Sequence, residues 1–191
     1  MKKVIFTLLA AALLVAAAPA VQAQELREGQ LTSKEAYELL RRLSGNWLVS
    51  HYTWQPESRT FHQTTGEAQI SHAYQGSFLH EKADLKLPDG SKKRQECFLG
   101  YSAEKSRFEL IQADEKSRNT TLMVGKWYPE CNAITLTHPD GLKKGVLSSI
   151  EYVYVFLSDN ALLKIVRTLD KDGNLLILSK DYYTPRQTAS R

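Results

Sequence analysis

Cysteine is scarce in this 191-residue sequence, which contains only Cys97 and Cys131. Cys97 falls within a predicted strand, and Cys131 falls in a turn two strands later along the chain. Strands two apart in a sheet lie about 9.6 Å from each other, whereas a disulfide needs Cα atoms within about 7 Å. A disulfide stays an alternative, but this placement favours two separate, half-buried thiols.

Motifs for catalysis and metal binding are also lacking. The sequence has no Gly-x-Ser-x-Gly elbow, no phosphate-binding loop, no dinucleotide fingerprint and no Cys-x-x-Cys pair. Its five histidines stand apart, without the spacing of a metal-ligand pair: His51, His62, His72, His80 and His138. We therefore expect no metal and no cofactor, and the motifs give no support to an enzyme.

Long apolar runs are missing after the N-terminus. The chain begins with Met-Lys-Lys, continues with an apolar run over residues 4–18, and reaches a small-x-small sequence at Val21 and Ala23. This order is typical of a bacterial secretory signal peptide over residues 1–23. The run is shorter than the about 20 residues of a membrane-spanning helix, and no nearby cysteine can carry a lipid. We expect a periplasmic or secreted protein without a membrane anchor, with residues 24–191 as one domain.

The charge of the chain is close to balanced. It has 25 basic and 21 acidic residues, and cleavage of a signal peptide that contains Lys2 and Lys3 leaves 23 against 21, or a net charge of +2. A protein that binds nucleic acid through its backbone phosphates normally carries a marked positive excess. We therefore expect no nucleic-acid partner.

One short helix is predicted directly after the signal peptide. Thr32-x-x-Glu35 forms a capping box, in which each residue satisfies a free amide of the first turn. Apolar residues then recur on one helical face at Ala36, Leu39, Leu40 and Leu43. The pattern predicts a helix over Ser33–Leu43 that ends at Ser44-Gly45, where glycine takes a left-handed conformation at little cost.

The rest of the chain reads as about ten antiparallel strands. Short β-branched and aromatic segments alternate with turn sequences such as Pro88-Asp89-Gly90, and short connections join antiparallel neighbours. The expected strands are Trp47–Trp54, Glu67–Tyr74, Ser77–Leu87, Lys92–Tyr101, Arg107–Ala113, Thr120–Tyr128, Ala133–Thr137, Leu147–Leu157, Ala161–Leu169 and Leu175–Tyr183. This series predicts an all-β fold, either an up-and-down barrel or two packed sheets.

Two strands carry a charged residue on an otherwise apolar face. Glu81 shares its face with leucines and alanine, and Arg167 shares its face with Leu163, Ile165 and Leu169. A buried charge needs a partner, so the two residues could form an ion pair, or Arg167 could stack on Trp47. Together with nearby aromatic residues they could instead orient a carboxylate or phenolic ligand. The candidate ligand-binding residues are Glu81, Arg167, Tyr101, Tyr152 and Trp127.

The segment over residues 150–157 is apolar on both faces of the predicted strand. Tyr152, Tyr154 and Phe156 alternate with Val153 and Val155. A strand of this kind is covered on both sides. Either the N-terminal helix or a partner chain would supply the cover, so the sequence permits a monomer or a homodimer.

The segment Leu43-Ser44-Gly45-Asn46-Trp47, at the junction of helix and first strand, resembles the Gly-x-Trp opening of the calycin superfamily, which includes the lipocalins. The resemblance implies that Gly45 allows the tight turn and that Trp47 plugs the closed end of a barrel. Two later segments, Gly76-Ser77-Phe78-Leu79-His80-Glu81 and Leu99-Gly100-Tyr101-Ser102, resemble those of an uncharacterised family of small bacterial proteins with a Leu-x-Gly-x-Trp opening. The resemblance implies a lipocalin-like barrel and no particular activity.

Nitrobindin-like barrels are a neighbouring possibility, since they hold haem through a histidine near the C-terminal strands. The last histidine of this sequence is His138, so a haem ligand would have to come from elsewhere.

Three functions are compatible with these features. The first is an exported barrel that binds a small apolar or amphipathic molecule, either in a closed cavity or in an open, lipid-carrying groove. The second is a structural or interaction protein with a filled barrel. The third is a cofactor-free enzyme that uses Glu81, Arg167 and a tyrosine inside the barrel.

Overall fold

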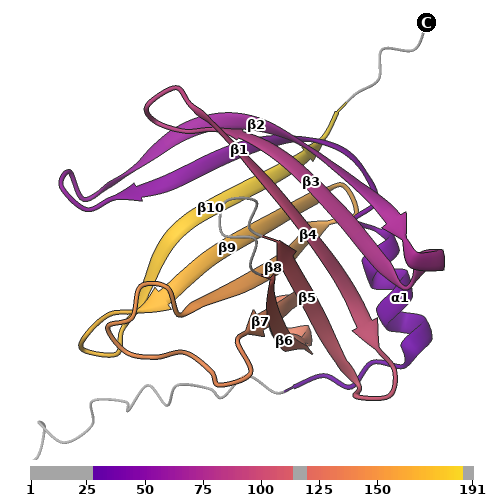
Figure 1. Cartoon of the computed structure of the whole chain (residues 1–191). Helices are drawn as coiled ribbons and strands as arrows, with labels where there is room; N and C mark the ends of the chain where they lie inside the picture. Colours follow the sequence, from indigo (N-terminus) through magenta and orange to yellow (C-terminus); the bar gives the residue numbers. More distant parts are fainter. Residues whose placement is uncertain (1–27, 114–119, 187–191) are drawn as a thin grey trace, which may run out of the picture.

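The computed structural model describes residues 28–113 and 120–186, so the predicted signal peptide over residues 1–23 lies outside the described part. Ten antiparallel strands close into one barrel, in which each strand pairs with its sequence neighbours and β1 pairs with β10 (Figure 1). The all-β, up-and-down barrel with one preceding helix is thereby confirmed.

The elements are α1 (Ser33–Arg41), β1 (Gly45–Gln55), β2 (Thr60–Ala73), β3 (Phe78–Lys86), β4 (Lys92–Ser102), β5 (Arg107–Ala113), β6 (Thr120–Tyr128), β7 (Ala133–Thr137), β8 (Ile150–Ser158), β9 (Ala161–Leu169) and β10 (Leu175–Pro185), with short 3-10 turns at Tyr74–Gly76 and Pro129–Cys131.

Helix α1 begins as its capping box predicts. The Thr32 side chain accepts a hydrogen bond from the backbone amide of Glu35, and the Glu35 carboxylate accepts one from the backbone amide of Thr32. The helix ends at Arg41 rather than at Leu43. Gly45 does not cap it but opens β1 with a φ of +151°, outside the helical region.

One end of the barrel is closed by α1, which lies across it (Figure 1). Trp47 is 5% exposed, and its indole Nε1 donates a hydrogen bond to the Leu43 carbonyl over 3.0 Å. The guanidinium of Arg42 lies 5.6 Å from the ring centre of Phe156, an inward-facing residue of β8. Of the two covers considered for the doubly apolar strand β8, the N-terminal helix is therefore wrong, because α1 packs on the end of the barrel.

The opposite end, which we call the mouth, is ringed by the connections over residues 56–59, 87–91, 138–149 and 170–174. Between the two ends, inward-facing residues alternate with outward-facing ones on every strand. The buried apolar core lies toward the closed end, where Leu79, Leu99, Phe108, Ile134 and Leu162 are each at most 4% exposed.

Both cysteines are free thiols, so the disulfide alternative is wrong. Cys97 is buried and Cys131 is exposed, which differs from the expectation that both are half-buried. Cys97 points into the barrel from β4, whereas Cys131 lies in the 3-10 turn between β6 and β7. Among residues 28–113 and 120–186, no helix combines the length and the apolar character that crossing a membrane requires.

We predict that Trp47→Ala lowers the free energy of unfolding by about 3–5 kcal/mol, because it leaves a large cavity at the closed end. The measurement is urea denaturation. Leu48→Ala is the matched control, since Leu48 is 45% exposed on the outer wall of the same strand. Its effect should stay below about 1 kcal/mol, and equal losses for the two variants would contradict the assignment of Trp47 to the closed end.

Candidate functional site

Glu81 of β3 is the centre of a polar cluster buried inside the barrel. Its carboxylate accepts hydrogen bonds from Lys164 Nζ at 3.1 and 3.2 Å and from Tyr183 Oη at 2.6 Å. Tyr154 Oη at 3.4 Å and Cys97 Sγ at 3.3 Å complete its surroundings. These five residues, here called the Glu81 cluster, come from β3, β4, β8, β9 and β10, and so connect both sides of the barrel.

The charges within the cluster stabilise each other. Burial alone would raise the pKa of Glu81, but the positive charge of Lys164 and the hydrogen bond from Tyr183 outweigh this effect and hold the pKa below its usual 4.5. Burial alone would likewise lower the pKa of Lys164, yet the carboxylate of Glu81 holds that pKa well above its usual 10.5. The pair is therefore ionised at neutral pH.

The other members of the cluster are neutral hydrogen-bond donors. Burial raises the pKa of the Cys97 thiol, and the nearby carboxylate of Glu81 raises it further. Burial also raises the pKa of Tyr154 and of Tyr183 well above the usual 10.0. All three groups keep their protons at neutral pH, so Cys97 is not a reactive thiolate.

Tyr152 links the cluster to the mouth. The ammonium of Lys164 lies 5.6 Å from the ring centre of Tyr152 and 5.5 Å from that of Tyr154. The hydroxyl of Tyr152 donates a hydrogen bond to Gln112 Oε1 over 3.0 Å. Gln112 is half-buried and faces inward, since it pairs in register with the buried Cys97. Its amide nitrogen is thus held at the boundary between the core and the mouth.

The mouth is lined by inward-facing side chains that are only half-buried. Each lies on the same face as a buried neighbour or as another member of the set, because residues paired across antiparallel strands point to one side of the sheet. We call this set the mouth vestibule; it comprises Thr53, Gln95, Gln112, Ile150, Val166 and Ser179.

A pocket of about 290 Å³ opens on one side of the mouth vestibule. Its barrel wall consists of Gln112, Thr121, Met123 and Ile150, and its outer wall is the connection over residues 138–149. The hydroxyl of Thr168 fixes that connection by donating to the carbonyl of Ser149. The pocket therefore combines amide and hydroxyl groups with apolar side chains.

The predicted site residues are not all in one place. Glu81 and Tyr152 lie in the interior within reach of Lys164, whereas Tyr101 and Trp127 lie at the closed end. Arg167 points to the outer wall and pairs with Glu151, so it neither meets Glu81 nor stacks on Trp47. The expected partnership of Glu81 with Arg167 is wrong, because the inward face of β9 carries the even-numbered residues.

The interior cation that sequence reasoning missed is Lys164. The two faces of β9 are almost equally apolar, and each carries one cation: Leu162, Lys164, Val166 and Thr168 point inward, whereas Leu163, Ile165, Arg167 and Leu169 point outward. The pattern of β9 alone could not tell these faces apart. Pairing its register with that of β8, whose Tyr154 and Phe156 are inward, would have placed Lys164 inside.

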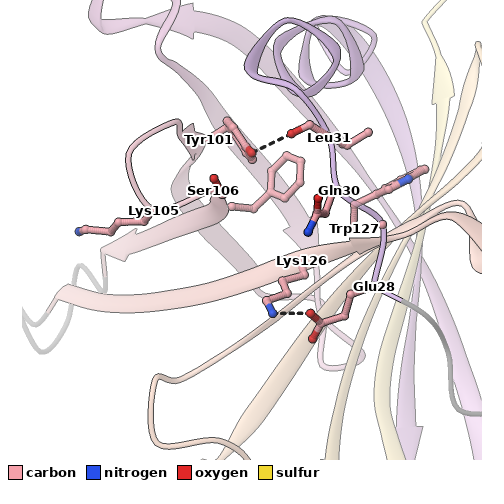
Figure 2. Close-up of a pocket in the computed structure, with 10 residues that line it drawn as sticks. Glu28, Gln30, Leu31, Tyr101, Lys105, Ser106, Lys126 and Trp127 are labelled. Carbon is pink, nitrogen blue, oxygen red and sulfur yellow. Dashed lines mark hydrogen bonds and ion pairs between the residues drawn. The ribbon is translucent and has the colours of Figure 1, made fainter.

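Tyr101 and Trp127 line a second hollow of about 420 Å³ at the closed end, which Figure 2 shows. The N-terminal segment over residues 28–31 crosses this hollow. Its Gly29 amide donates to the Trp127 carbonyl over 2.9 Å, and the Tyr101 hydroxyl donates to the Leu31 carbonyl over 3.1 Å. Glu28 forms an ion pair with Lys126 at the edge. The polar groups around this hollow are thus paired with one another. The hollow marks the place where the N-terminal segment packs against the barrel.

The histidine next to Glu81 in the sequence lies outside the Glu81 cluster. His80 points outward and pairs with Glu96 while its neighbour Glu81 points inward, as alternation along a strand predicts. In the part of the chain that the structure describes, no three His, Cys, Asp or Glu side chains gather closely enough to hold a metal ion.

The class that the structure defines is a closed, ten-strand antiparallel barrel with a helix across one end. The chain belongs to DUF1579, a family of proteins of unknown function whose profile matches residues 32–187. The predicted ten-strand barrel is confirmed, while the likeness to the calycin superfamily, the bacterial source and the Leu-x-Gly-x-Trp signature stay predictions.

One solved structure supports the same fold. The chain is similar to Rv2717c from M. tuberculosis, with 18% identity and a TM-score of 0.56 over 80% of this chain and 98% of that one. It is more distantly similar to the S-type phycobiliprotein lyase CPES from Guillardia theta, with 9% identity and a TM-score of 0.42 over 83% of this chain and 95% of that one. No curated protein sequence matches the chain.

We predict that Lys164→Met lowers the free energy of unfolding by about 3–5 kcal/mol, because it leaves the Glu81 carboxylate buried without a counter-charge. Adding Glu81→Gln to this variant should restore most of the loss. Urea denaturation measures both effects. Lys82→Met, at an exposed position of β3, is the control and should change stability by less than about 0.5 kcal/mol. If Lys164→Met proves as stable as Lys82→Met, the ion pair between Glu81 and Lys164 is not needed for stability.

The pKa of Glu81 also predicts a loss of stability in acid. Because the pKa is lower in the folded protein than in the unfolded chain, the carboxylate stabilises the fold fully above pH 4.5 and loses this effect as the pH falls through the folded-state value. Unfolding measured from neutral pH down to about pH 3 should therefore show a steeper acid loss for the natural protein than for the Glu81→Gln, Lys164→Met double variant. If the stability of the two proteins falls equally with pH, the lowered pKa assigned to Glu81 is contradicted.

Proposed function

We propose that this protein is an exported barrel that binds a small amphipathic molecule at its mouth. The observation that carries the proposal is the mouth vestibule, whose inward-facing side chains remain partly exposed instead of filling the barrel. The interior of a small barrel is either filled by side chains or holds one small ligand. An accessible interior wall next to a pocket is typical of a binding site.

The size and lining of the pocket support a small ligand with both polar and apolar parts. Ligand pockets commonly measure about 300–1,000 Å³, and the pocket of about 290 Å³ lies at the lower limit of that range. Met123 and Ile150 of the pocket wall offer apolar contact, as does Val166 of the adjoining mouth vestibule. The amide oxygen of Gln112 accepts from Tyr152, which leaves its NH2 group to donate to a carbonyl, carboxylate or phenolic oxygen of the ligand.

The Glu81 cluster forms the floor of this site rather than a part of it. Among the described residues, no buried side-chain nitrogen or oxygen lacks a hydrogen-bond partner. The carboxylate of Glu81 is fully occupied by donors from the protein, so it does not require a ligand. We therefore place the ligand above the layer of Tyr152 and Gln112.

The N-terminal sequence supports export. Cleavage before Gln24 would leave the segment over residues 28–31 in the mature chain, and that segment contacts the barrel at Trp127 and Tyr101. Cleavage at this position would thus keep the contacts that residues 29 and 31 make at the closed end. A periplasmic or secreted barrel, as a monomer or a homodimer, is part of this proposal.

We predict that Val166→Trp weakens binding of the fluorescent amphiphile anilinonaphthalene sulfonate at least about tenfold, because the indole occupies the mouth vestibule. The measurement is a fluorescence titration of the natural protein and the variant. Ile165→Trp is the matched control, because Ile165 neighbours Val166 on β9 but points outward. It should leave the dissociation constant within about twofold. Equal affinities for both variants, or no binding by the natural protein, would refute binding at the mouth.

A further inference from the structure

A second set of polar side chains lies in the interior wall beside the Glu81 cluster. His51 of β1 and Asp181 of β10 face each other in register and are 5% and 2% exposed. The Nδ1 atom of His51 contacts a carboxylate oxygen of Asp181. On the other side of the ring, Nε2 lies 2.8 Å from the hydroxyl oxygen of Thr53. The three side chains therefore form a continuous carboxylate–imidazole–hydroxyl chain.

The strand geometry aims this chain at the mouth. His51 and Thr53 are two residues apart on β1 and so share the inward face. His51 is buried, whereas Thr53 is half-buried and belongs to the mouth vestibule. Thr53 is thus the one residue of the chain that is partly exposed at the mouth.

This arrangement matches the chemistry of an activated nucleophile. The carboxylate of Asp181 orients the imidazole with its Nδ1 proton toward the acid, which leaves the Nε2 lone pair directed at the hydroxyl. The hydroxyl of Thr53 is then within the distance at which a histidine can remove its proton.

Two further polar residues flank Thr53 on the same face. Ser179 of β10 and His62 of β2 each lie directly opposite Thr53 in the register of their strands. Directly paired residues have Cβ atoms about 4.5–5.5 Å apart. Their hydroxyl and imidazole groups can therefore donate hydrogen bonds to an oxygen of a molecule that contacts Thr53, as an oxyanion hole does.

We propose that Thr53, His51 and Asp181 form an acyl-transfer site that acts on carboxylic esters of small molecules. The Thr53 oxygen attacks the ester carbonyl while His51 Nε2 takes the hydroxyl proton. The bond to the alcohol oxygen then breaks, and His51 returns the proton to the departing alkoxide, so an alcohol leaves and an acyl group stays on Thr53. Water, activated by His51, hydrolyses this second ester and releases a carboxylic acid with Thr53 restored.

This activity goes beyond the proposed binding function and is independent of it. Binding of an intact ligand needs only the mouth vestibule and its pocket. Acyl transfer needs the hydroxyl of Thr53 and its contact with His51. Asp181 contacts no substrate and is a positioning residue.

The direct test is to incubate the full-length mature protein with p-nitrophenyl acetate and to map acetylated residues by peptide mass spectrometry. We expect an acetyl group on Thr53 and release of nitrophenol. Thr53→Val, which keeps the side-chain shape, should lose both. Ser50→Ala is the control, because Ser50 is a hydroxyl residue of the same strand that lines the outer wall. It should leave both unchanged.

Two more variants separate chemistry from folding. Thr53→Ser should retain the acyl adduct, so it tests the proposal even if Thr53→Val does not fold. Asp181→Asn should lower kcat at least about 100-fold with little change in KM, because the imidazole loses its orientation while the pocket is intact. Melting temperatures identify variants that have only lost stability.

The proposal is overturned if the natural protein gains no acetyl group on Thr53, or if nitrophenol release is the same after Thr53→Val. Acetylation confined to lysines or to His62 would also overturn it. Probe binding that depends on Val166, together with an unreactive Thr53, would refute acyl transfer and keep the binding function. A reactive Thr53 in a protein that does not bind the probe would refute the binding function and support acyl transfer.

Discussion

The ion pair between Glu81 and Lys164 is the interaction on which the interior of this barrel depends. Two charges that are buried this deeply are tolerated only because each meets the other and because neutral donors satisfy the remaining carboxylate positions. The members of the Glu81 cluster come from five strands that are far apart in the sequence. Loss of either charge would therefore disturb the packing of β3 against β8, β9 and β10 together.

This cluster also divides the barrel into two parts with different roles. Between the cluster and the closed end, apolar side chains and Trp47 fill the space beneath α1. Toward the mouth, inward-facing residues such as Val166 and Ser179 remain partly exposed. A polar floor below an open wall would suit the reversible binding that we propose. The chain of Asp181, His51 and Thr53 passes through this boundary, with Thr53 on the open side.

Most of the fold follows from local signals in the sequence. The bounds of β5, β6, β7 and β9 agree with the predicted strands because clear turn residues flank them. Strand β2 begins at Thr60 instead of Glu67, since its first half is polar on both faces and is held by pairing with β1 rather than by burial. Strand β8 begins at Ile150 instead of Leu147, because the exposed Leu147 belongs to the connection at the mouth.

The candidate site was less predictable because it depends on register. Alternation placed Glu81 inside, but it assigned Arg167 to the interior in place of Lys164, three positions away on the other face of β9. The contact of His51 with Asp181 joins the first and last strands across the closure of the barrel. No local pattern contains such a contact, since closure is a property of the complete sheet.

The most direct test of this account is a crystal structure of the mature protein with anilinonaphthalene sulfonate bound. The account predicts the probe in the mouth vestibule, with its polar group near Gln112 and with the contacts between Glu81 and Lys164 unchanged. A probe bound at the closed end beside Trp127, or one that separates Glu81 from Lys164, would contradict it.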